Sequence, residues 1–259
     1  MIRTGIASVS FRALKADEII CLSQKAGLDG IEWGGDIHVP HGNIVVAEKV
    51  KEMSRDAGLE CPSYGSYYRA GELVKEKKVS FDAVLDSALA LGARTIRIWA
   101  GVQSSESSDD VYYSIVSDDI NKVSAASSRH NISISLEYHG KTLTDSVASA
   151  DKLFTMLDPA VRTYWQPLSH LSELEWATGL EKALPRLSNL HVYSWEPLDG
   201  KNIRHPLRHG AENWKTFLGT ASELPGERYA HLEFFKDDSP DQFLEDAATL
   251  KNIILSVQL

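Results

Sequence analysis

The stretch Ile132-Ser-Ile-Ser-Leu-Glu-Tyr-His-Gly140 decides the fold class of this chain. Apolar residues alternate with polar ones up to Glu137, which is typical of a β-strand with one face in an apolar core. Side chains two positions apart in a strand share a face, so Glu137 and His139 should project together. An amphipathic segment over 143–156 predicts a helix after the glycine. An acid and an imidazole at the tip of such a strand suggest a site, with a surface carboxylate as the alternative.

The same strand-then-helix pattern recurs along the chain. Early helices are expected to end at Gly27, Gly58 and Gly92, because glycine commonly follows the last residue of a helix. Ser172 with Glu175, and Ser239 with Gln242, have the spacing of helix starts. The predicted strands are 2–9, 28–33, 59–64, 95–99, the stretch quoted above, 162–166, 189–193 and 228–234.

Eight alternating units predict a parallel sheet that closes into a single (β/α)8 TIM barrel, an α/β fold, over residues 1–259 as one domain. A chain of 259 residues is typical of such a barrel. An open doubly wound sheet is the alternative. The absence of a Gly-x-Gly-x-x-Gly motif after the first strand, and of a phosphate-binding loop that ends in Lys-Ser/Thr, disfavours it.

Composition and charge exclude several classes of partner. The net charge of −9 disfavours nucleic acid, whose phosphates require a basic surface. The sequence has no run of 18 apolar residues, so no membrane span is predicted. Its first residues lack the apolar core of a signal peptide. Cys21 and Cys61 do not form a metal-type pair and are expected to be reduced. We expect a cytoplasmic protein with no membrane partner; a homo-oligomer is compatible with the sequence.

Polar residues stand at the ends of the later predicted strands. In a TIM barrel the active site lies at the C-terminal strand ends, where buried acids and imidazoles are costly unless paired or bound to a metal. Glu137, Gln166, His191 and Glu233 end the fifth to eighth strands. Their oxygen and nitrogen donors suit one divalent ion such as Mn²⁺, Mg²⁺ or Zn²⁺. The sequence therefore predicts a metal site at this end of the barrel.

Other residues near the strand ends are candidates for binding substrate hydroxyl groups or, alternatively, for filling the interior. Trp33 and Trp99 are candidates to line the mouth or to pack against helices. The loop 204–209, Arg-His-Pro-Leu-Arg-His, follows the seventh strand, a frequent place for phosphate sites in barrels, although a solvated loop is the alternative. The candidate substrate-binding residues are Glu32, Arg97, His139, Tyr193, Arg204 and His231.

In the xylose isomerase-like superfamily of sugar isomerases and epimerases, strands five to eight carry Glu, a carboxylate, His and Glu in this order. The order Glu137, Gln166, His191 and Glu233 resembles that pattern. That superfamily includes ketose 3-epimerases, inosose dehydratase-like proteins and family-two AP endonuclease-like proteins. The stretches 30–38, 96–101 and 232–239 are similar to the broad sugar phosphate isomerase/epimerase group, and the resemblance covers essentially the whole chain.

The resemblance implies that Glu137, Gln166, His191 and Glu233 hold the ion and that Glu137 and Glu233 are the catalytic acid and base. The sixth-strand position is usually Asp, so Gln166 removes one negative charge and metal binding should be weaker than in relatives. Strands five and eight stand three apart in an eight-strand ring, which would place the two glutamates across the mouth from each other.

The expected function is a metal-dependent epimerase or isomerase of a small carbohydrate. The ion would stabilise an enediolate, and the glutamates would move a proton next to a carbonyl group. A keto-polyol dehydratase with the same metal site is one alternative. A non-catalytic carbohydrate-binding barrel is another, because of Gln166. A DNA-repair endonuclease is disfavoured, since it would need a multi-zinc cluster and a basic face.

Overall fold

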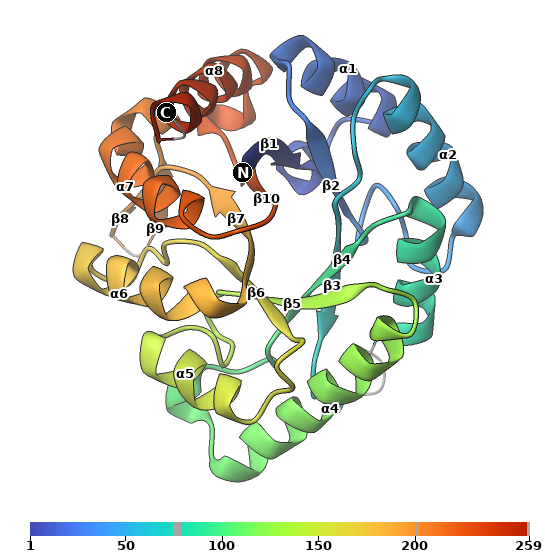
Figure 1. The fold of residues 1–259 in the computed structure, drawn as a ribbon, viewed down its shortest axis with the longest axis vertical. Coiled ribbons are helices and arrows are strands. Elements are labelled where there is room, and N and C mark those ends of the chain that lie inside the picture. Colours follow the sequence, from blue (N-terminus) through green and yellow to red (C-terminus); the bar gives the residue numbers. More distant parts are fainter. Residues whose placement is uncertain (75–78, 200, 258–259) are drawn as a thin grey trace.

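The computed structural model describes residues 1–74, 79–199 and 201–257. Its parallel strands form a closed barrel, which confirms the predicted (β/α)8 fold, and helices surround the ring of strands (Figure 1). The barrel strands, in their order around the ring, are β1 (Ile2–Ala7), β2 (Gly30–Gly34), β3 (Ser63–Arg69), β4 (Thr95–Trp99), β5 (Ser133–Glu137), β6 (Arg162–Trp165), β7 (Leu187–Val192) and β10 (Arg228–Leu232).

The helices cover the barrel by burying one apolar face each. In the last helix, Phe243, Ala247, Leu250 and Ile254 form that face and all four are buried. Ser172 and Glu175 form the predicted capping box at the start of the sixth helix. The helices are α1 (Ala16–Ala26), α2 (Ile44–Asp56), α3 (Phe81–Leu91), α4 (Asp110–Ser128), α5 (Val147–Thr155), α6 (Glu173–Ala183), α7 (Ala211–Ser222) and α8 (Pro240–Val257).

The third strand differs from the prediction of 59–64. Glu60 makes only an isolated bridge to Gly30, and β3 begins after Pro62, which has no N–H to donate to a sheet. The strand then continues to Arg69, with a shift of register against β4. Tyr67 lies in this added part with φ of 54°, a backbone region that non-glycine residues rarely adopt.

A hairpin that the sequence analysis missed follows β7. Its strands, β8 (Trp195–Leu198) and β9 (Lys201–Arg204), pair antiparallel, with Trp195 opposite Arg204. The short 3₁₀ helix η5 (Leu207–Gly210) then leads into α7. The hairpin and η5 occupy the chain between β7 and α7, so they belong to the loops at the C-terminal end of the barrel.

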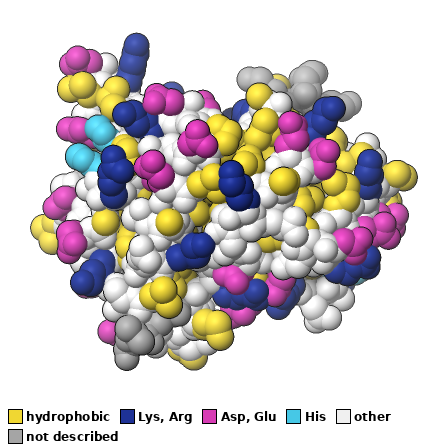
Figure 2. Space-filling view, turned by 90° about the horizontal axis from the view of Figure 1, so that it is seen from above, with side chains coloured by type: hydrophobic (Ala, Val, Ile, Leu, Met, Phe, Trp, Pro, Cys, Tyr) yellow, Lys and Arg dark blue, Asp and Glu magenta, His cyan; other side chains and the backbone are white. Residues whose placement is uncertain are grey.

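The surface carries acidic and basic side chains interspersed with each other in the view of Figure 2. Within the described ranges, no helix combines the length and apolar character needed to cross a membrane.

Candidate metal and active site

Four predicted donors come together at the C-terminal end of the barrel. Glu137 ends β5 and His191 lies in β7, while Gln166 and Glu233 directly follow β6 and β10. Parallel pairing of β10 with β7 places Glu233 beside the end of β7, because the Glu233 amide donates to the Val192 carbonyl at 3.0 Å. The strand order therefore brings the four side chains into one group.

The separations within this group suit a single divalent ion. His191 Nδ1 lies 3.2 Å from Gln166 Oε1, 3.4 Å from a Glu137 oxygen and 3.5 Å from a Glu233 oxygen. Ligand atoms bound at about 2.1 Å from a metal stand about 3.0–3.4 Å from one another. The donor set present thus fits an ion, with small side-chain adjustments.

Gln166 is oriented so that its carbonyl oxygen faces the other donors. Its Nε2 donates to the Tyr138 carbonyl at 2.6 Å and to Glu137 Oε1 at 3.2 Å. Its Oε1 is left on the side of His191. The amide can therefore contribute an oxygen ligand without the charge of an aspartate.

Arg97 fixes the charge state of Glu137. Its guanidinium is buried, with Nε donating to Glu32 at 2.8 Å and Nη1 donating to Glu137, which also accepts from Trp99 Nε1. Burial alone would raise the pKa of Glu137, but the charge of Arg97 outweighs it and holds that pKa well below its usual range. Glu137 is therefore ionised at neutral pH.

The pKa values of His191 and Glu233 are raised, whereas that of Glu137 is lowered. Burial would lower the pKa of His191, but the charges of Glu233 and Glu32 outweigh it and raise the pKa to about 10. Burial and the nearby charge of Glu137 raise the pKa of Glu233 to about 7. Metal binding would displace the His191 proton. Before any ion binds, the pKa values of the two glutamates therefore lie far apart, with that of Glu137 lowered and that of Glu233 raised.

A cavity of about 470 Å³ opens over the donors, and Glu137, Gln166 and Glu233 line it. Aromatic rings form much of its wall. Trp99 stacks on His139 with ring centroids 4.4 Å apart, and Tyr193 stacks on Trp195 at 4.1 Å. The site thus combines flat apolar surfaces with a few converging polar groups, as small-molecule sites do.

The predicted substrate-binding residues divide into two groups. Arg97, His139 and Tyr193 line the cavity. Among the residues that the structure describes, Glu32, His231 and Arg204 lie outside its wall. Glu32 pairs with Arg97 and His191 below the cavity floor.

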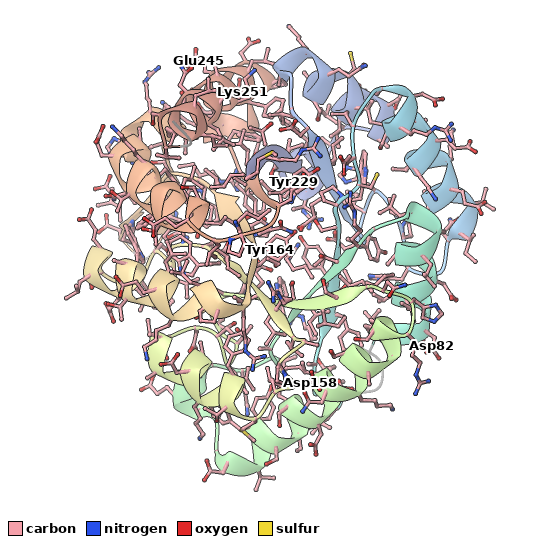
Figure 3. All side chains as sticks on the ribbon, in the orientation of Figure 1. Asp82, Asp158, Tyr164, Tyr229, Glu245 and Lys251 are labelled. Atoms are coloured by element: carbon pink, nitrogen blue, oxygen red, sulfur yellow. The ribbon has the colours of Figure 1, made fainter. Side chains whose placement is uncertain are left out.

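His231 is fully buried in the barrel interior. Its ring lies 5.4 Å from Tyr229 and 6.1 Å from Tyr164, and Figure 3 shows both tyrosines inside the ring of strands. Burial lowers its pKa to about 3, so the imidazole is neutral. A Cβ at Gly5 would lie 2.4 Å from its Nδ1, so glycine is needed beside it. His231 therefore fills the barrel interior, which the sequence analysis gave as the alternative to binding substrate hydroxyl groups.

Both arginines of the loop 204–209 form ion pairs with acidic side chains, so their charges are not available to a phosphate group. Arg204 donates to Asp238 at 2.5 Å and stacks over Phe234, and Arg208 pairs with Glu245 at 3.3 Å. Of the two candidate tryptophans, Trp99 lines the cavity, whereas Trp33 is fully buried.

Several cavity residues were missed by the sequence analysis. Tyr67 comes from the unpredicted end of β3, and Trp195 and Asn202 come from the unpredicted hairpin. Trp195 stands two positions after Tyr193, so extending the alternation of the seventh strand would have found it. No comparable pattern marks Tyr67.

The sequence matches the family model described as xylose isomerase-like TIM barrel over residues 21–253. A search among curated proteins finds no match.

Solved structures of the same fold include a probable dehydratase, an epimerase and a magnesium complex. The probable 3-DHS dehydratase AsbF from Bacillus anthracis is 19% identical with a TM-score of 0.79, covering 96% of this chain and 99% of that one. The 3-keto-D-glucoside 4-epimerase YcjR from E. coli is 16% identical with a TM-score of 0.70, covering 97% and 100%. A xylose isomerase-like protein from Mycobacterium smegmatis, in complex with magnesium, is 16% identical with a TM-score of 0.75, covering 99% and 98%. At these identities the likeness concerns the fold.

Proposed function

The chain belongs to the xylose isomerase-like TIM barrel family, and from this premise we propose that it is a divalent-metal-dependent carbohydrate epimerase or isomerase. The proposed reaction begins with removal of a proton next to a carbonyl group. The observation that carries the proposal is the convergence of Gln166, Glu137 and Glu233 on His191 Nδ1 at the floor of a cavity. The epimerase among the solved structures of this fold is in keeping with it.

The cavity supports a small carbohydrate as the substrate class. A volume of about 470 Å³ is in the range of small-molecule sites. The rings of Trp99, Tyr193, Trp195 and Phe234 offer apolar surfaces for a sugar face, and Arg97 and Gln166 offer groups for hydroxyls. The pairing of Arg204 and Arg208 with acids argues against a phosphate held by those side chains.

A divalent ion held by Glu137, Gln166, His191 and Glu233 would act as a Lewis acid on the substrate carbonyl. The chain's own residues perform the proton transfers. Arg97 keeps Glu137 ionised, so Glu137 serves as a fixed negative ligand. Glu233 lines the cavity beside these ligands and accepts the substrate proton.

A second proton-transfer group is needed on the other face of the substrate carbon. The nearest oxygens of Glu137 and Glu233 lie within 4.8 Å of each other. Groups about 3–3.5 Å from opposite faces of one carbon stand about 6–7 Å apart. This closeness favours shared ion binding for the pair, and it makes His139 a better candidate than Glu137 for the second transfer.

His139 uses one ring nitrogen in a hydrogen bond to the main chain. Its Nδ1 donates to the Gly140 carbonyl at 2.7 Å, because a carbonyl can only accept, so Nε2 is the ring nitrogen left for proton transfer with a substrate. Among the described residues, no side chain or carbonyl hydrogen-bonds Nε2. The ring lies in the cavity wall, stacked on Trp99.

The same arrangement supports a second candidate, dehydration of a keto-polyol. A lyase needs a base for the proton next to the carbonyl and an acid for the departing hydroxyl, and His139 and Glu233 supply that pair. The probable dehydratase of the same fold is in keeping with this candidate.

One experiment tests both candidates. The protein is loaded in turn with Mn²⁺, Mg²⁺ and Zn²⁺ and incubated in D₂O with a panel of keto-sugars and cyclic keto-polyols. The masses of the products are then measured by mass spectrometry. An epimerase or isomerase gives a product of unchanged composition that carries solvent deuterium, whereas a dehydratase gives a product lighter by one water. A metal-loaded protein that exchanges no deuterium into any substrate contradicts both.

Glu233→Gln and His139→Gln separate the roles. Each should lower turnover by about 10²–10⁴-fold. Metal content is measured in parallel, because Glu233 is also a proposed ligand, whereas His139→Gln should leave metal content unchanged.

A further inference from the structure

Three metal-ligating side chains meet outside the barrel, beside the hairpin. Glu196 lies in β8, His205 directly follows β9, and His209 lies in η5. One donor atom from each lies within 4.8 Å of the other two. Histidine side chains beside acidic ones are visible on the surface in Figure 2. We propose that Glu196, His205 and His209 form a second metal site, for Zn²⁺ or a similar transition-metal ion, that clamps the hairpin to η5.

The geometry of the three donors is close to that of a zinc site. Glu196 Oε2 lies 3.0 Å from His205 Nε2, and ligands on a tetrahedral zinc ion stand about 3.3 Å apart. The His205 and His209 rings stack with centroids 4.3 Å apart and planes 20° apart. Two imidazoles and one carboxylate are a common zinc ligand set, which leaves a fourth position for water.

The main chain beneath the donors is already fixed. The His205 amide donates to the Ser194 carbonyl at 2.8 Å, closing the base of the hairpin. The Leu207 amide donates to the buried carboxylate of Asp246 at 2.8 Å, which holds η5 against α8. Side-chain rotations are therefore enough to complete the site, and the Glu196 side chain is exposed.

The charges around the site favour a cation. The two arginines in this loop are matched by acids, with Arg204 on Asp238 and Arg208 on Glu245. The chain as a whole carries a net charge of −9. Among the described residues, the ion-pair partner of Glu196 is His205, so no guanidinium competes for its charge.

The clamp acts on the wall of the central cavity. Glu196 and His209 line a separate cavity of about 290 Å³ together with Tyr193 and Trp195. Tyr193 and Trp195 also line the central cavity, so these stacked rings divide the two. Because Trp195 precedes Glu196 in β8, an ion that anchors Glu196 also anchors Trp195.

Zinc stoichiometry, measured by competition with a chromogenic chelator, tests the site. We expect wild type to bind one more equivalent of Zn²⁺ than His209→Ala or His205→Ala. The matched control is His130→Ala, at an exposed histidine in the turn after α4, which should bind as wild type does. If the central site binds zinc, the counts are two and one; if it does not, they are one and zero. Equal stoichiometry in wild type and His209→Ala overturns the proposal.

Limited proteolysis tests the clamp without any activity assay. Lys201 is exposed at the start of β9, between the donors Glu196 and His205. With free Zn²⁺ at ten times its dissociation constant, tryptic cleavage after Lys201 should slow about tenfold in wild type and in His130→Ala. Cleavage of His209→Ala should not respond to zinc. A wild-type cleavage rate that zinc leaves unchanged contradicts the clamp.

Discussion

Gln166 is the uncharged member of the proposed metal site formed with Glu137, His191 and Glu233, which we call the central site. Replacing it with Asp adds a negative charge beside the proposed ion, while Gln166→Asn shortens the side chain without adding charge. We expect Gln166→Asp to bind Mn²⁺ about tenfold more tightly than Gln166→Asn, a difference of about 1.4 kcal/mol, by titration calorimetry. Equal affinities in two folded variants would mean that residue 166 does not face the ion.

Gln166→Asp should also make the metal-free protein less stable. The wild-type amide donates to Glu137 and to the Tyr138 carbonyl, and an aspartate can do neither. It would instead place a third carboxylate near Glu137 and Glu233. Thermal melting in EDTA should show a lower midpoint for the Asp variant than for wild type, and saturating Mn²⁺ should reverse the order. A metal-free Asp variant as stable as wild type would contradict this account.

Arg97 balances two buried carboxylates, Glu32 and Glu137. Arg97→Met leaves both without the guanidinium and should cost about 3–5 kcal/mol of unfolding free energy in urea titrations. The matched control is Arg94→Met, whose side chain is 70% exposed and pairs with Glu60, with an expected cost below about 1 kcal/mol. Similar costs for both variants would show that the buried network does not stabilise the fold.

The four proposed donor residues could be predicted because each one lies at or next to the end of a strand of a recognisable barrel. Glu32 and His231 could not be placed correctly. Alternation along a strand shows which side chains face the interior, but it does not show how far along the barrel axis each one lies. That height depends on the register between strands, which pairs His231 with His191 below Glu233.

At the scale of elements, His38 ties together loops at the mouth of the barrel. Ser8 Oγ accepts from the Gly34 amide and donates to His38 Nδ1 at 2.9 Å, and His38 Nε2 donates to the Leu14 carbonyl at 3.2 Å. These bonds use the neutral imidazole. Burial lowers the pKa of His38 below its ordinary 6.5.

A lowered pKa in the folded state makes stability depend on pH in one direction. Below about pH 6.5 the unfolded chain binds a proton that the folded His38 resists, so stability is present above that pH and is lost as the pH falls. The melting temperature should therefore drop less between pH 7 and pH 5 in His38→Gln than in wild type. His130→Gln, at an exposed site, should follow wild type. An unchanged drop in His38→Gln would exclude His38 as a contributor.

The elements that could be predicted are those with a strong period. The buried stripe of α8 and the capping box of α6 were visible in the sequence. The start of β3 was predicted too early, because the apolar Leu59 followed by the polar Glu60 has the alternation of a strand. Regular pairing begins only after Pro62, which has no N–H to donate. The hairpin was missed because its alternation is short and it packs outside the barrel core.

At the scale of the whole molecule, eight strand-and-helix units could be predicted to close into a barrel, since connections of this type require parallel neighbours. Closure places β5 and β10 three apart in the ring, with β6 and β7 between them. The shape of the mouth could not be predicted in the same way. It depends on Tyr67, Trp195 and Asn202, which come from irregular segments.

The central claim is that an ion at Glu137, Gln166, His191 and Glu233 enables proton removal next to a carbonyl. The most direct measurement is deuterium incorporation from D₂O into substrate by metal-loaded protein, by the same protein after EDTA treatment, and by Glu233→Gln. We predict deuterium at the carbon beside the carbonyl with the loaded wild type, and incorporation at least about 10²-fold slower in the other two samples. Product formed without deuterium, or exchange that continues undiminished after removal of the metal, would contradict the claim.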